Sequence, residues 1–522
     1  MKTTRAALFV VTLALLAASA PPPRGSAQEK SPPSSALTES SYRRARAALD
    51  AGLRALGGVE ALRAVEDFSL RETGRSFFVN QSTQADPPFG SGPAEETLVV
   101  DLKNNRAYYE VKNTFPGGSG HGKNYVSGAE GTAYDLRAMT ATPINNPSIQ
   151  NFRPQMRRLP HVLLLEALER APTLRWLGED TFRGRRQNVF TFIRADGRQA
   201  SVYLDAETHL VSKYDLVFTS GASGDGLIEF HYNDYRDLGG IKVPRGRTLK
   251  NSGEVVEERD YVEVKINARP GDDVFQAPAS GFTRITPPAQ QQAGLVVEKL
   301  AEDVYVLRGL AGGNNNVLFV AFDDYVLVAD APEAGFFANT TQQVMAKIKE
   351  TVPGKPIKYV VATHHHGDHS GGLRGYVAEG VTIVTTPGNR RYVERLLAAP
   401  FAVEPDALAL RPRQPVFEFI EAKKRVFADA RHAVEVHDIG PNPHADELVV
   451  VYLPKEKILF QADLVGAAPG GPVNFVQDST LRMAERIGQL GLDVERIVGA
   501  HGRTVTIAEF RAALDRRARA ER

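Results

Sequence analysis

The spacing of hydrophobic positions changes along the chain. From Tyr42 to Val65 apolar residues recur at helical spacing, and Gly57-Gly58 should interrupt this helix. From Phe68 to about Phe275 the period is two, which is typical of half-buried strands. Beyond about residue 295, strand patterns alternate with helical ones. The chain is therefore predicted to be an α+β protein with two differently built halves.

The first half predicts a large antiparallel sheet. Asn104-Asn105 and Asp196-Gly197 are turn sequences that place two hairpins. The predicted hairpins and strands are Thr97–Tyr109, Val189–Leu204, Leu210–Phe218, Leu227–Tyr235, Val243–Leu249 and Val255–Ile266. A helix from Pro160 to Ala171 interrupts the series, and the segments 82–95 and 112–150, rich in Gly, Pro, Asn and Ser, are predicted as loops.

The second half predicts an αββα sandwich, because strands alternate with helices but include antiparallel neighbours. The predicted strands are Val304–Leu307, Val317–Phe322, Tyr325–Asp330, Ile357–Ala362, Ala433–His437, Leu448–Leu453, Ile458–Gln461 and Ile497–Val498. Helices are predicted at Ala338–Thr351, Pro387–Leu397 and Ser479–Leu490. We expect a sheet domain at 41–280, a Pro- and Gln-containing linker at 281–294 and the sandwich at 295–515.

The N-terminal residues are typical of an export signal. Lys2 and Arg5 precede an apolar stretch from Ala6 to Ala18 that is too short to cross a bilayer comfortably. Pro21 disfavours cleavage after Ala20, so we expect a signal peptide at 1–27 and a disordered leader at 28–40. The expected location is the periplasm or the exterior, and no later segment is long and apolar enough to be a membrane span.

The composition of the chain bears on its partners, its metal ligands and its nucleophile. Lys plus Arg (63) balances Asp plus Glu (62), so no global positive field favours nucleic acid as a partner. There is no cysteine, which excludes a lipid-modified cysteine at the signal, thiolate metal ligands and a cysteine nucleophile.

One short segment contains several residues that can bind metal ions. The strand ending at Ala362 leads into Thr363-His364-His365-His366-Gly367-Asp368-His369. In an extended tip His364 and His366 share one side while His365 points away. The turn at Gly367 can bring Asp368 and His369 toward a second metal position. More ligands must come from elsewhere, and His444, Asp463 and His501 each lie at the end of a predicted strand.

The pattern His364-x-His366-x-Asp368-His369 followed by His444, Asp463 and His501 resembles the metallo-β-lactamase superfamily over about 295–515. The resemblance implies two zinc ions, although other divalent transition metals suit the same donors. His364, His366 and His444 would hold one ion, Asp368, His369 and His501 the other, and Asp463 would bridge them. Asp330 would support a ligand from outside the metal shell, and Asp368 would be the catalytic proton acceptor and donor.

The resemblance also bears on the substrate. The best-known β-lactamase subclass has Cys at the position of Asp463 and a substrate-binding Lys at that of Gly466, whereas an Asp bridge resembles glyoxalase II, lactonase and phosphodiesterase branches. Residues 466–472 lack the basic glutathione-binding residues of glyoxalase II. We therefore expect a hydrolase that uses a metal-bridging hydroxide on a carbonyl ester, lactone, thioester or amide. β-Lactamase or phosphodiesterase activity is the alternative.

The first half resembles the periplasmic lipoprotein-carrier fold in its general pattern, carried by ALGGVEALRAV, SVYLDAETHLVSKYDLV and FHYNDYRDLGGIKVP. This resemblance implies a curved sheet whose concave face could hold a lipid or another apolar ligand. A scaffold or dimerisation role is an equal alternative. A different class of function follows if the metal region were largely structural, because the protein would then be an apolar-ligand binder.

Overall fold

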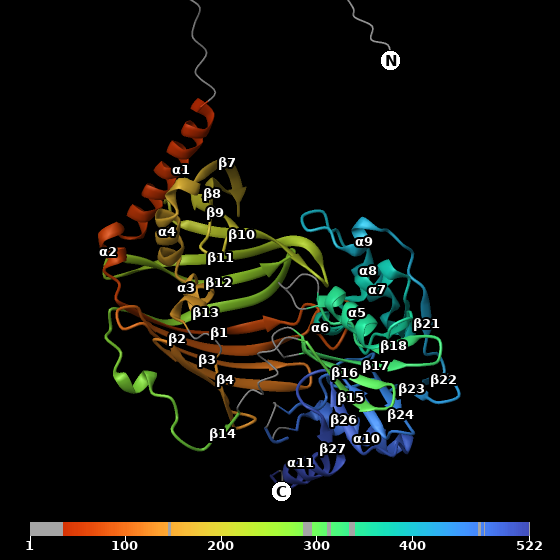
Figure 1. The fold of residues 1–522 in the computed structure, drawn as a ribbon. Coiled ribbons are helices and arrows are strands. Elements are labelled where there is room, and N and C mark those ends of the chain that lie inside the picture. Colours follow the sequence, from red (N-terminus) through yellow and green to blue (C-terminus); the bar gives the residue numbers. More distant parts are fainter. Residues whose placement is uncertain are drawn as a thin grey trace, which may run out of the picture.

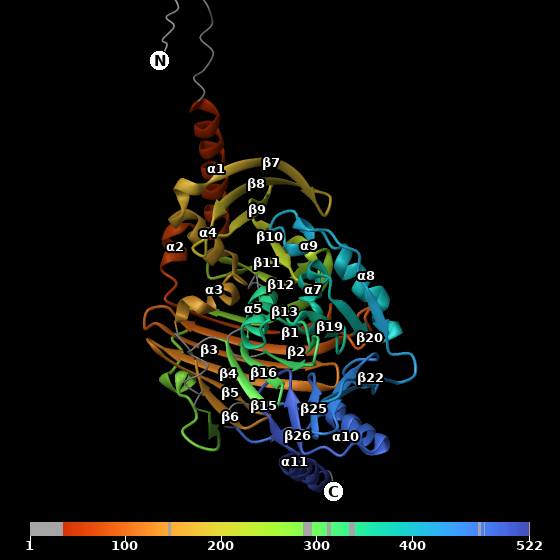
Figure 2. The same ribbon diagram turned by 45° about the vertical axis from the view of Figure 1, so that its right-hand side comes forward.

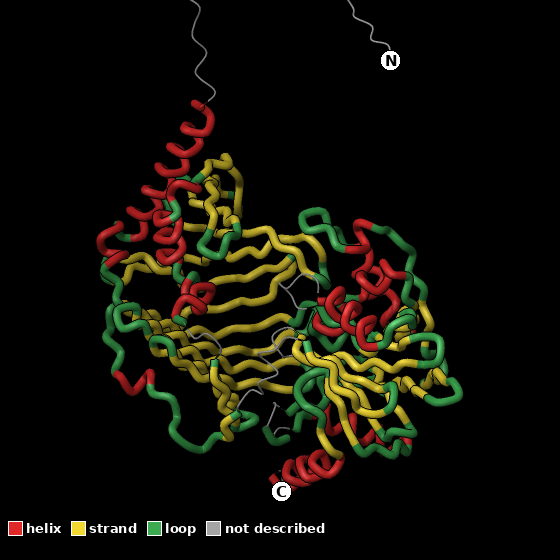
Figure 3. Tube along the Cα trace, viewed as in Figure 1, coloured by secondary structure: helices red, strands yellow, loops and turns green. Residues whose placement is uncertain are grey.

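The structure is a computed structural model that describes residues 35–144, 148–285, 295–310, 315–333, 340–467, 471–473 and 476–520. Its strands form one 14-stranded sheet in the first half and a 7-stranded and a 6-stranded sheet in the second. The two halves lie side by side (Figures 1 and 3). The predicted signal peptide and most of the predicted linker fall outside the described residues.

The large sheet is antiparallel apart from its short edge strand, and it runs in the order β14-β6-β5-β4-β3-β2-β1-β13-β12-β11-β10-β9-β8-β7. Its strands are β1 Asp67–Phe77, β2 Ser91–Asp101, β3 Arg106–Phe115, β4 Gly118–Ser127, β5 Glu130–Asp135, β6 Thr140–Pro143, β7 Arg175–Phe182, β8 Arg185–Ile193, β9 Gln199–Asp205, β10 Val211–Ser220, β11 Gly224–Leu238, β12 Ile241–Asn251, β13 Glu254–Ile266 and β14 Thr283–Arg284. The sheet is strongly curved (Figure 2).

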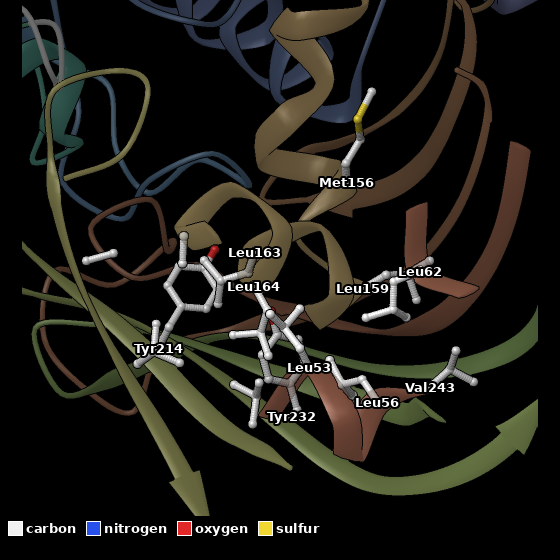
Figure 4. Packing of buried hydrophobic residues seen from close by; sticks show 14 of the residues in the cluster. Leu53, Leu56, Leu62, Met156, Leu159, Leu163, Leu164, Tyr214, Tyr232 and Val243 are labelled. Atoms are coloured by element: carbon white, nitrogen blue, oxygen red, sulfur yellow. The ribbon is translucent and has the colours of Figure 1, made fainter. Parts of the chain in front are cut away.

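Helices fill the inner side of the curve. They are α1 Ser35–Leu56, α2 Val59–Arg63, α3 Arg153–Met156 and α4 Pro160–Glu169, with 3₁₀ turns at Ile149–Phe152 and Ala171–Thr173. A further 3₁₀ turn, Asp272–Phe275, packs Phe275 against the other face of the sheet. Leu53 and Leu56 of α1 and Leu163 and Leu164 of α4 are fully or almost fully buried against sheet residues such as Tyr214 (Figure 4). Burial of each such leucine contributes about 1.5–3 kcal/mol to the stability of the fold. Because the buried face of each helix must therefore be apolar, its leucines recur at helical spacing in the sequence.

Three segments of this half differ from the sequence predictions. Residues 112–150 were predicted as loop, but they contain β4, β5, β6 and the end of β3, and β2 begins at Ser91 inside the predicted loop 82–95. The strand β4 reads Gly-Ser-Gly-His-Gly-Lys and buries little of its first half, so it lacks the apolar alternation on which the prediction relied. The helix α1 begins at Ser35, so residues 35–40 of the predicted leader are helical, and an ion pair between Glu39 and Arg43 lies on that turn.

The second half has the predicted αββα layers. One sheet consists of β15 Val296–Ala301, β16 Val304–Leu310, β17 Asn315–Ala321, β18 Val326–Ala329, β19 Ile357–Val361, β20 Thr382–Thr385 and β21 Phe417–Phe419. The other consists of β22 Lys424–Ala428, β23 Ala433–Asp438, β24 Val449–Leu453, β25 Ile458–Gln461, β26 Arg496–Gly499 and β27 Val505–Thr506. Val361 and Phe460 are among the fully buried side chains that join the two sheets.

Helices cover the outer faces of both sheets. The first sheet is covered by α5 Thr340–Thr351, α7 Leu373–Glu379, α8 Arg390–Ala398 and α9 Ala407–Leu410, preceded by the short α6 Gly367–Ser370 and a 3₁₀ turn at Pro387–Asn389. The second sheet is covered by α10 Asp478–Leu490 and α11 Ile507–Ala520. No helix in the described ranges is both long and apolar enough to cross a membrane.

Three hairpin tips of the large sheet reach the second half. The β1–β2 loop, residues 78–90, lies along α6, where Gly367 N donates to the Asn80 carbonyl over 3.2 Å. At the β3–β4 tip, a Cβ added to Gly117 would lie 2.9 Å from Ser479 Cβ. At the β10–β11 tip, Asp225 N donates to the Pro400 carbonyl over 2.7 Å. The large sheet is therefore in direct contact with the segment that carries the predicted metal ligands (Figure 1).

Candidate metal centre

The predicted ligands lie where strands end. β18 leads to Asp330, β19 to the histidine segment, β25 to Asp463 and β26 to His501. β18 pairs with β19 and β25 with β26 in parallel, so within each sheet the carboxyl ends of the two strands meet at one edge. His444 comes from the loop between β23 and β24. The sandwich thus assembles seven candidate ligands that are up to 137 positions apart in the sequence, from His364 to His501, with Asp330 beside them.

These residues form two groups that share one member. In each group the ligand atoms all lie within 4.8 Å of one another. The first group is His364, His366, His444 and Asp463, and the second is Asp368, His369, Asp463 and His501. All seven predicted ligands therefore converge, with Asp463 between the two groups.

The distances within the groups fit a divalent cation. His444 Nε2 lies 3.2 Å from His364 Nε2, and His501 Nε2 lies 3.3 Å from His369 Nε2. Nitrogens at 2.0–2.1 Å from one tetrahedral zinc ion are about 3.3 Å apart. Asp463 Oδ2 lies 3.1 Å from His444 Nε2 and 2.9 Å from His369 Nε2. The donor set and its spacing therefore suit a metal ion in each group.

Hydrogen bonds on the far side of two imidazoles orient them. His369 Nδ1 lies 2.7 Å from Asp330 Oδ2, which leaves Nε2 to face Asp463. Asp330 Oδ1 accepts from the Thr363 hydroxyl over 2.8 Å, and that hydroxyl lies 3.2 Å from His364 Nδ1. Asp330 therefore supports the ligands from outside the groups, as carboxylates commonly do at metal-binding histidines.

Two aspartates at the site have left-handed backbone conformations. The φ angle is +74° at Asp330 and +66° at Asp463, and both residues directly follow or lie just beyond a buried strand. A non-glycine residue in this region costs on the order of 1 kcal/mol or more and persists only where the surroundings enforce it. Here the turn after β25 is held by Gln461, whose Oε1 accepts from Leu464 N over 2.8 Å. In this backbone conformation the Asp463 carboxylate points into the site.

Burial keeps imidazoles of the first group neutral. Burial lowers the pKa of His364 well below its usual value, and the neighbouring His366 and His369 add to the effect. Burial likewise lowers the pKa of His366. Neutral imidazole is the form that binds a metal ion, so these side chains are ready to act as ligands at neutral pH.

The second group is built to hold positive charge. Burial lowers the pKa of His501, but hydrogen bonds to Asp368 and Asp463 outweigh it and raise that pKa to about 10. The pKa of His369 is raised well above its usual value, since Asp463, Asp368 and Asp330 together outweigh burial. The carboxyl of Asp463 has its pKa held well below the usual range, because His369 and the surrounding imidazoles outweigh burial. Such an excess of carboxylate favours a cation.

Comparison with known proteins agrees with this geometry. Residues 311–501 match the sequence profile of the metallo-beta-lactamase superfamily. The C-terminal region belongs to this superfamily. This match bears out the resemblance seen in the sequence and supports a metallo-hydrolase. The αββα layers predicted for the second half are present in the structure itself.

Relatives of the metallo-beta-lactamase region have diverged far. The chain is 22% identical over 207 residues to the metallo-beta-lactamase type 2 of Elizabethkingia meningoseptica, covering 38% of this chain and 74% of that protein. It is 28% identical over 109 residues to an alkyl/aryl-sulfatase of Saccharomyces cerevisiae, covering 20% of this chain and 16% of the yeast protein. The structure of a metallo-beta-lactamase from Pontibacter korlensis is 24% identical and covers 42% of this chain and 97% of that one, with a TM-score of 0.32.

The remaining histidines pack or pair outside the two ligand groups. His365 is buried beside Tyr392 with 5.5 Å between ring centroids, and burial lowers its pKa to about 3. His437 pairs with Glu435 on β23. Neither ligand group includes any of the other histidines of the described residues, which are His121, His161, His209, His231, His432 and His437.

A cavity of about 280 Å³ opens onto the first ligand group. His366, His444 and Asp463 line it from the metallo-beta-lactamase region, together with Gln477. Its other wall comes from the large sheet and consists of Gln81, Phe115 and Pro116. Sequence reasoning missed these three residues because they lie more than 240 positions before the first ligand, Phe115 and Pro116 in a predicted loop and Gln81 directly before another. A Phe-Pro-Gly-Gly tip between two strands was the only local signal.

Proposed function

We propose that this chain is an exported hydrolase that holds two zinc ions and cleaves a carbonyl ester, lactone, thioester or amide. The observation that carries the proposal is the pair of ligand groups sharing Asp463 beside a cavity with an apolar wall. A structural zinc site is normally closed and four-coordinate, whereas this donor set is larger and adjoins a cavity.

The chain's own side chains would do the following. Zinc ions bound there supply Lewis acidity and activate water as a nucleophile at neutral pH. Asp463 holds the two groups together, since its Oδ2 lies near His444 and His369 and its Oδ1 lies 3.0 Å from His501 Nε2. Asp368, which has a partly exposed side chain, accepts the proton of the attacking water and returns it to the leaving group. The His369 and His501 side chains keep Asp368 ionised, because they outweigh the effect of burial and lower its pKa.

The cavity wall favours a substrate with an apolar or aromatic part. Phe115 and Pro116 face the ligand groups across the cavity and present carbon rather than charge. The inner side of the large sheet is an unsuitable place for such a group. It is occupied by the leucines of α1 and α4 and by buried Arg247, Arg158 and Glu72. Lipid binding by the sheet, and its likeness to a lipoprotein carrier, stay predictions.

The sequence of the first 27 residues supports export. The protein would then act in the periplasm or outside the cell. Two relatives are named as a metallo-beta-lactamase and an alkyl/aryl-sulfatase, so β-lactams and alkyl sulfates are included among the alternatives. Asp463 and Gly466 favour carboxyl esters over β-lactams, as the sequence indicated.

A substrate panel on zinc-loaded protein tests the proposal. Aryl esters, lactones, thioesters, β-lactams, alkyl sulfates and phosphodiesters are compared at equal enzyme and metal. We expect a carboxyl substrate with an aromatic or acyl tail to be turned over fastest. Asp368→Asn should lower its turnover by about 10²-fold or more. Faster cleavage of the phosphodiester or sulfate than of every carboxyl substrate would contradict the proposal.

A further inference from the structure

We infer that Gln81, on the β1–β2 loop of the large sheet, is a positioning residue of the metal centre that orients the Asp368 carboxylate. The inference rests on the proposed function insofar as it concerns the second metal ion. It makes the N-terminal sheet a part of the active site, which neither the superfamily match over 311–501 nor any ligand pattern includes.

The β1–β2 loop is fixed along the ligand segment. Gly367 N donates to the Asn80 carbonyl over 3.2 Å, and Asp446 N donates to the Thr83 carbonyl over 2.9 Å. Further along, Arg395 Nη2 donates to the Ala85 carbonyl over 2.7 Å. Within the loop, Gly90 N donates to the Ser82 hydroxyl over 2.8 Å, which closes it on itself. Gln81 is therefore held in place from both sides.

The hydrogen bond from Gln81 leaves the two carboxylate oxygens of Asp368 with different partners. Its amide Nε2 donates to Asp368 Oδ1 over 2.8 Å. Asp368 Oδ2 then faces the second ligand group, 3.4 Å from His501 Nε2 and 3.5 Å from His369 Nε2. A hydrogen bond to the oxygen that points away from the group restricts rotation of the carboxylate. Partners of this kind typically contribute 10- to 100-fold to metal affinity.

The next residue of the same loop orients a ligand of the first group. His366 Nε2 donates to the Ser82 carbonyl over 3.0 Å, so this nitrogen is occupied by a partner from the large sheet. The other ring nitrogen, Nδ1, is buried without a hydrogen-bond partner in the described part of the chain and lies 3.9 Å from Asp463 Oδ2. The loop thus makes one contact with each group, and both leave the metal-facing atom free.

Zinc affinity of full-length variants tests the inference. Gln81→Met keeps the length of the side chain and removes the donor, and Gln81→Ala removes both. Gln81 is exposed, so neither change should unfold the protein. In competition titrations with a chromophoric zinc chelator, we expect both variants to bind one of the two ions about tenfold less tightly and the other with unchanged affinity. Gln199→Met, at an exposed position of β9 far along the sheet, is the matched control and should resemble the unaltered protein.

The outcomes separate the two proposals. If Gln81→Met binds both zinc ions like the unaltered protein, Gln81 does not position Asp368, and a loss in Gln81→Ala alone would indicate packing only. Either result overturns the inference and leaves the proposed function in place. If the unaltered protein itself binds no more than trace zinc, the proposed function fails first. A kinetic check accompanies the titration: loss of positioning should lower kcat at saturating zinc more than it raises KM.

Discussion

Three histidines of the two ligand groups are each held by a partner on the side of the ring that faces away from the site. Asp330 holds His369, the Thr363 hydroxyl lies against His364, and the Ser82 carbonyl holds His366. Because each of these contacts uses one ring nitrogen, the other is directed into the site. His365, next to two of these histidines in the sequence, has no such arrangement and packs against Tyr392 instead.

The different surroundings of the ligands and of His365 predict the zinc content of substituted proteins. Asp463→Ala should reduce zinc from about two ions per chain to one or fewer, because Asp463 belongs to both ligand groups. His365→Ala should leave zinc content unchanged, although removal of a buried ring should lower thermal stability. Elemental analysis after zinc reconstitution measures both variants. Loss of zinc in His365→Ala with retention in Asp463→Ala would contradict the assignment of the ligands.

At the scale of elements, the β3–β4 hairpin connects the large sheet to the active site. Its tip carries Phe115 and Pro116 into the cavity wall, and Gly117 and Gly118 follow directly. Gly117 has a φ of +78°, and an added Cβ would lie 2.9 Å from Ser479 Cβ and 3.3 Å from His444 N. Glycine is needed there both for the conformation and for the close approach.

Replacing this glycine should disturb the active site more than replacing a similar one elsewhere. Gly128, in the next hairpin turn, has a φ of +58° and open space around its Cβ position. Gly117→Ala and Gly128→Ala should share a conformational cost of about 1 kcal/mol, but only the first should also displace the hairpin tip. We expect Gly117→Ala to raise KM for the preferred substrate about threefold or more and Gly128→Ala to leave KM unchanged. Equal KM values in the two variants would show that the tip is not part of the substrate site.

At the scale of the whole molecule, a buried cluster of charges lies on the inner side of the large sheet. Arg158 pairs with Glu72 over 2.7 Å and with Glu96 over 2.7 Å, and Arg259 pairs with Glu96 over 3.0 Å. Arg247 also pairs with Glu72 over 2.7 Å, so the cluster joins β1, β2, β12 and β13 to the chain before α4. A buried pair that loses one partner costs on the order of 3–5 kcal/mol.

The cluster should make the fold sensitive to acid. Burial raises the pKa of Glu96, but Arg158, Arg247 and the Tyr109 hydroxyl outweigh it and lower that pKa to about 2. A carboxyl whose pKa is lowered in the folded state stabilises the protein above its unfolded pKa, about 4.3, and this contribution is lost as pH falls through about 2. Thermal stability should therefore fall steeply from about pH 5 to pH 2.

Glu96→Gln should lower Tm at pH 7 and flatten this acid dependence, because glutamine has no proton to gain. Glu95→Gln, on the exposed face of the same strand, should change neither. Tm measured by circular dichroism across this pH range tests both variants. An unchanged acid slope in Glu96→Gln would rule out Glu96 as its source.

The amino-acid sequence determined the parts of this protein that depend on local pattern. Helical leucine spacing placed α1 and α4, and apolar runs placed the central strands of both sheets of the sandwich, although not their edge strands. Strand-end His and Asp residues named all seven members of the two ligand groups. Buried strands need apolar residues, and the metal donors here are His and Asp, so both features can be recognised from residue types in the sequence.

Only the tertiary structure decided how the halves combine. The glycine-rich β4 carries no apolar alternation, and its pairing depends on neighbouring strands. Gln81 reaches the site through its side-chain amide and Ser82 through its backbone carbonyl, and neither has a distinctive sequence pattern. Phe115 reaches the cavity at a hairpin tip, for which the Pro-Gly-Gly that follows is the only local signal. A backbone carbonyl is present at every residue, so its role at His366 follows from its position in space alone.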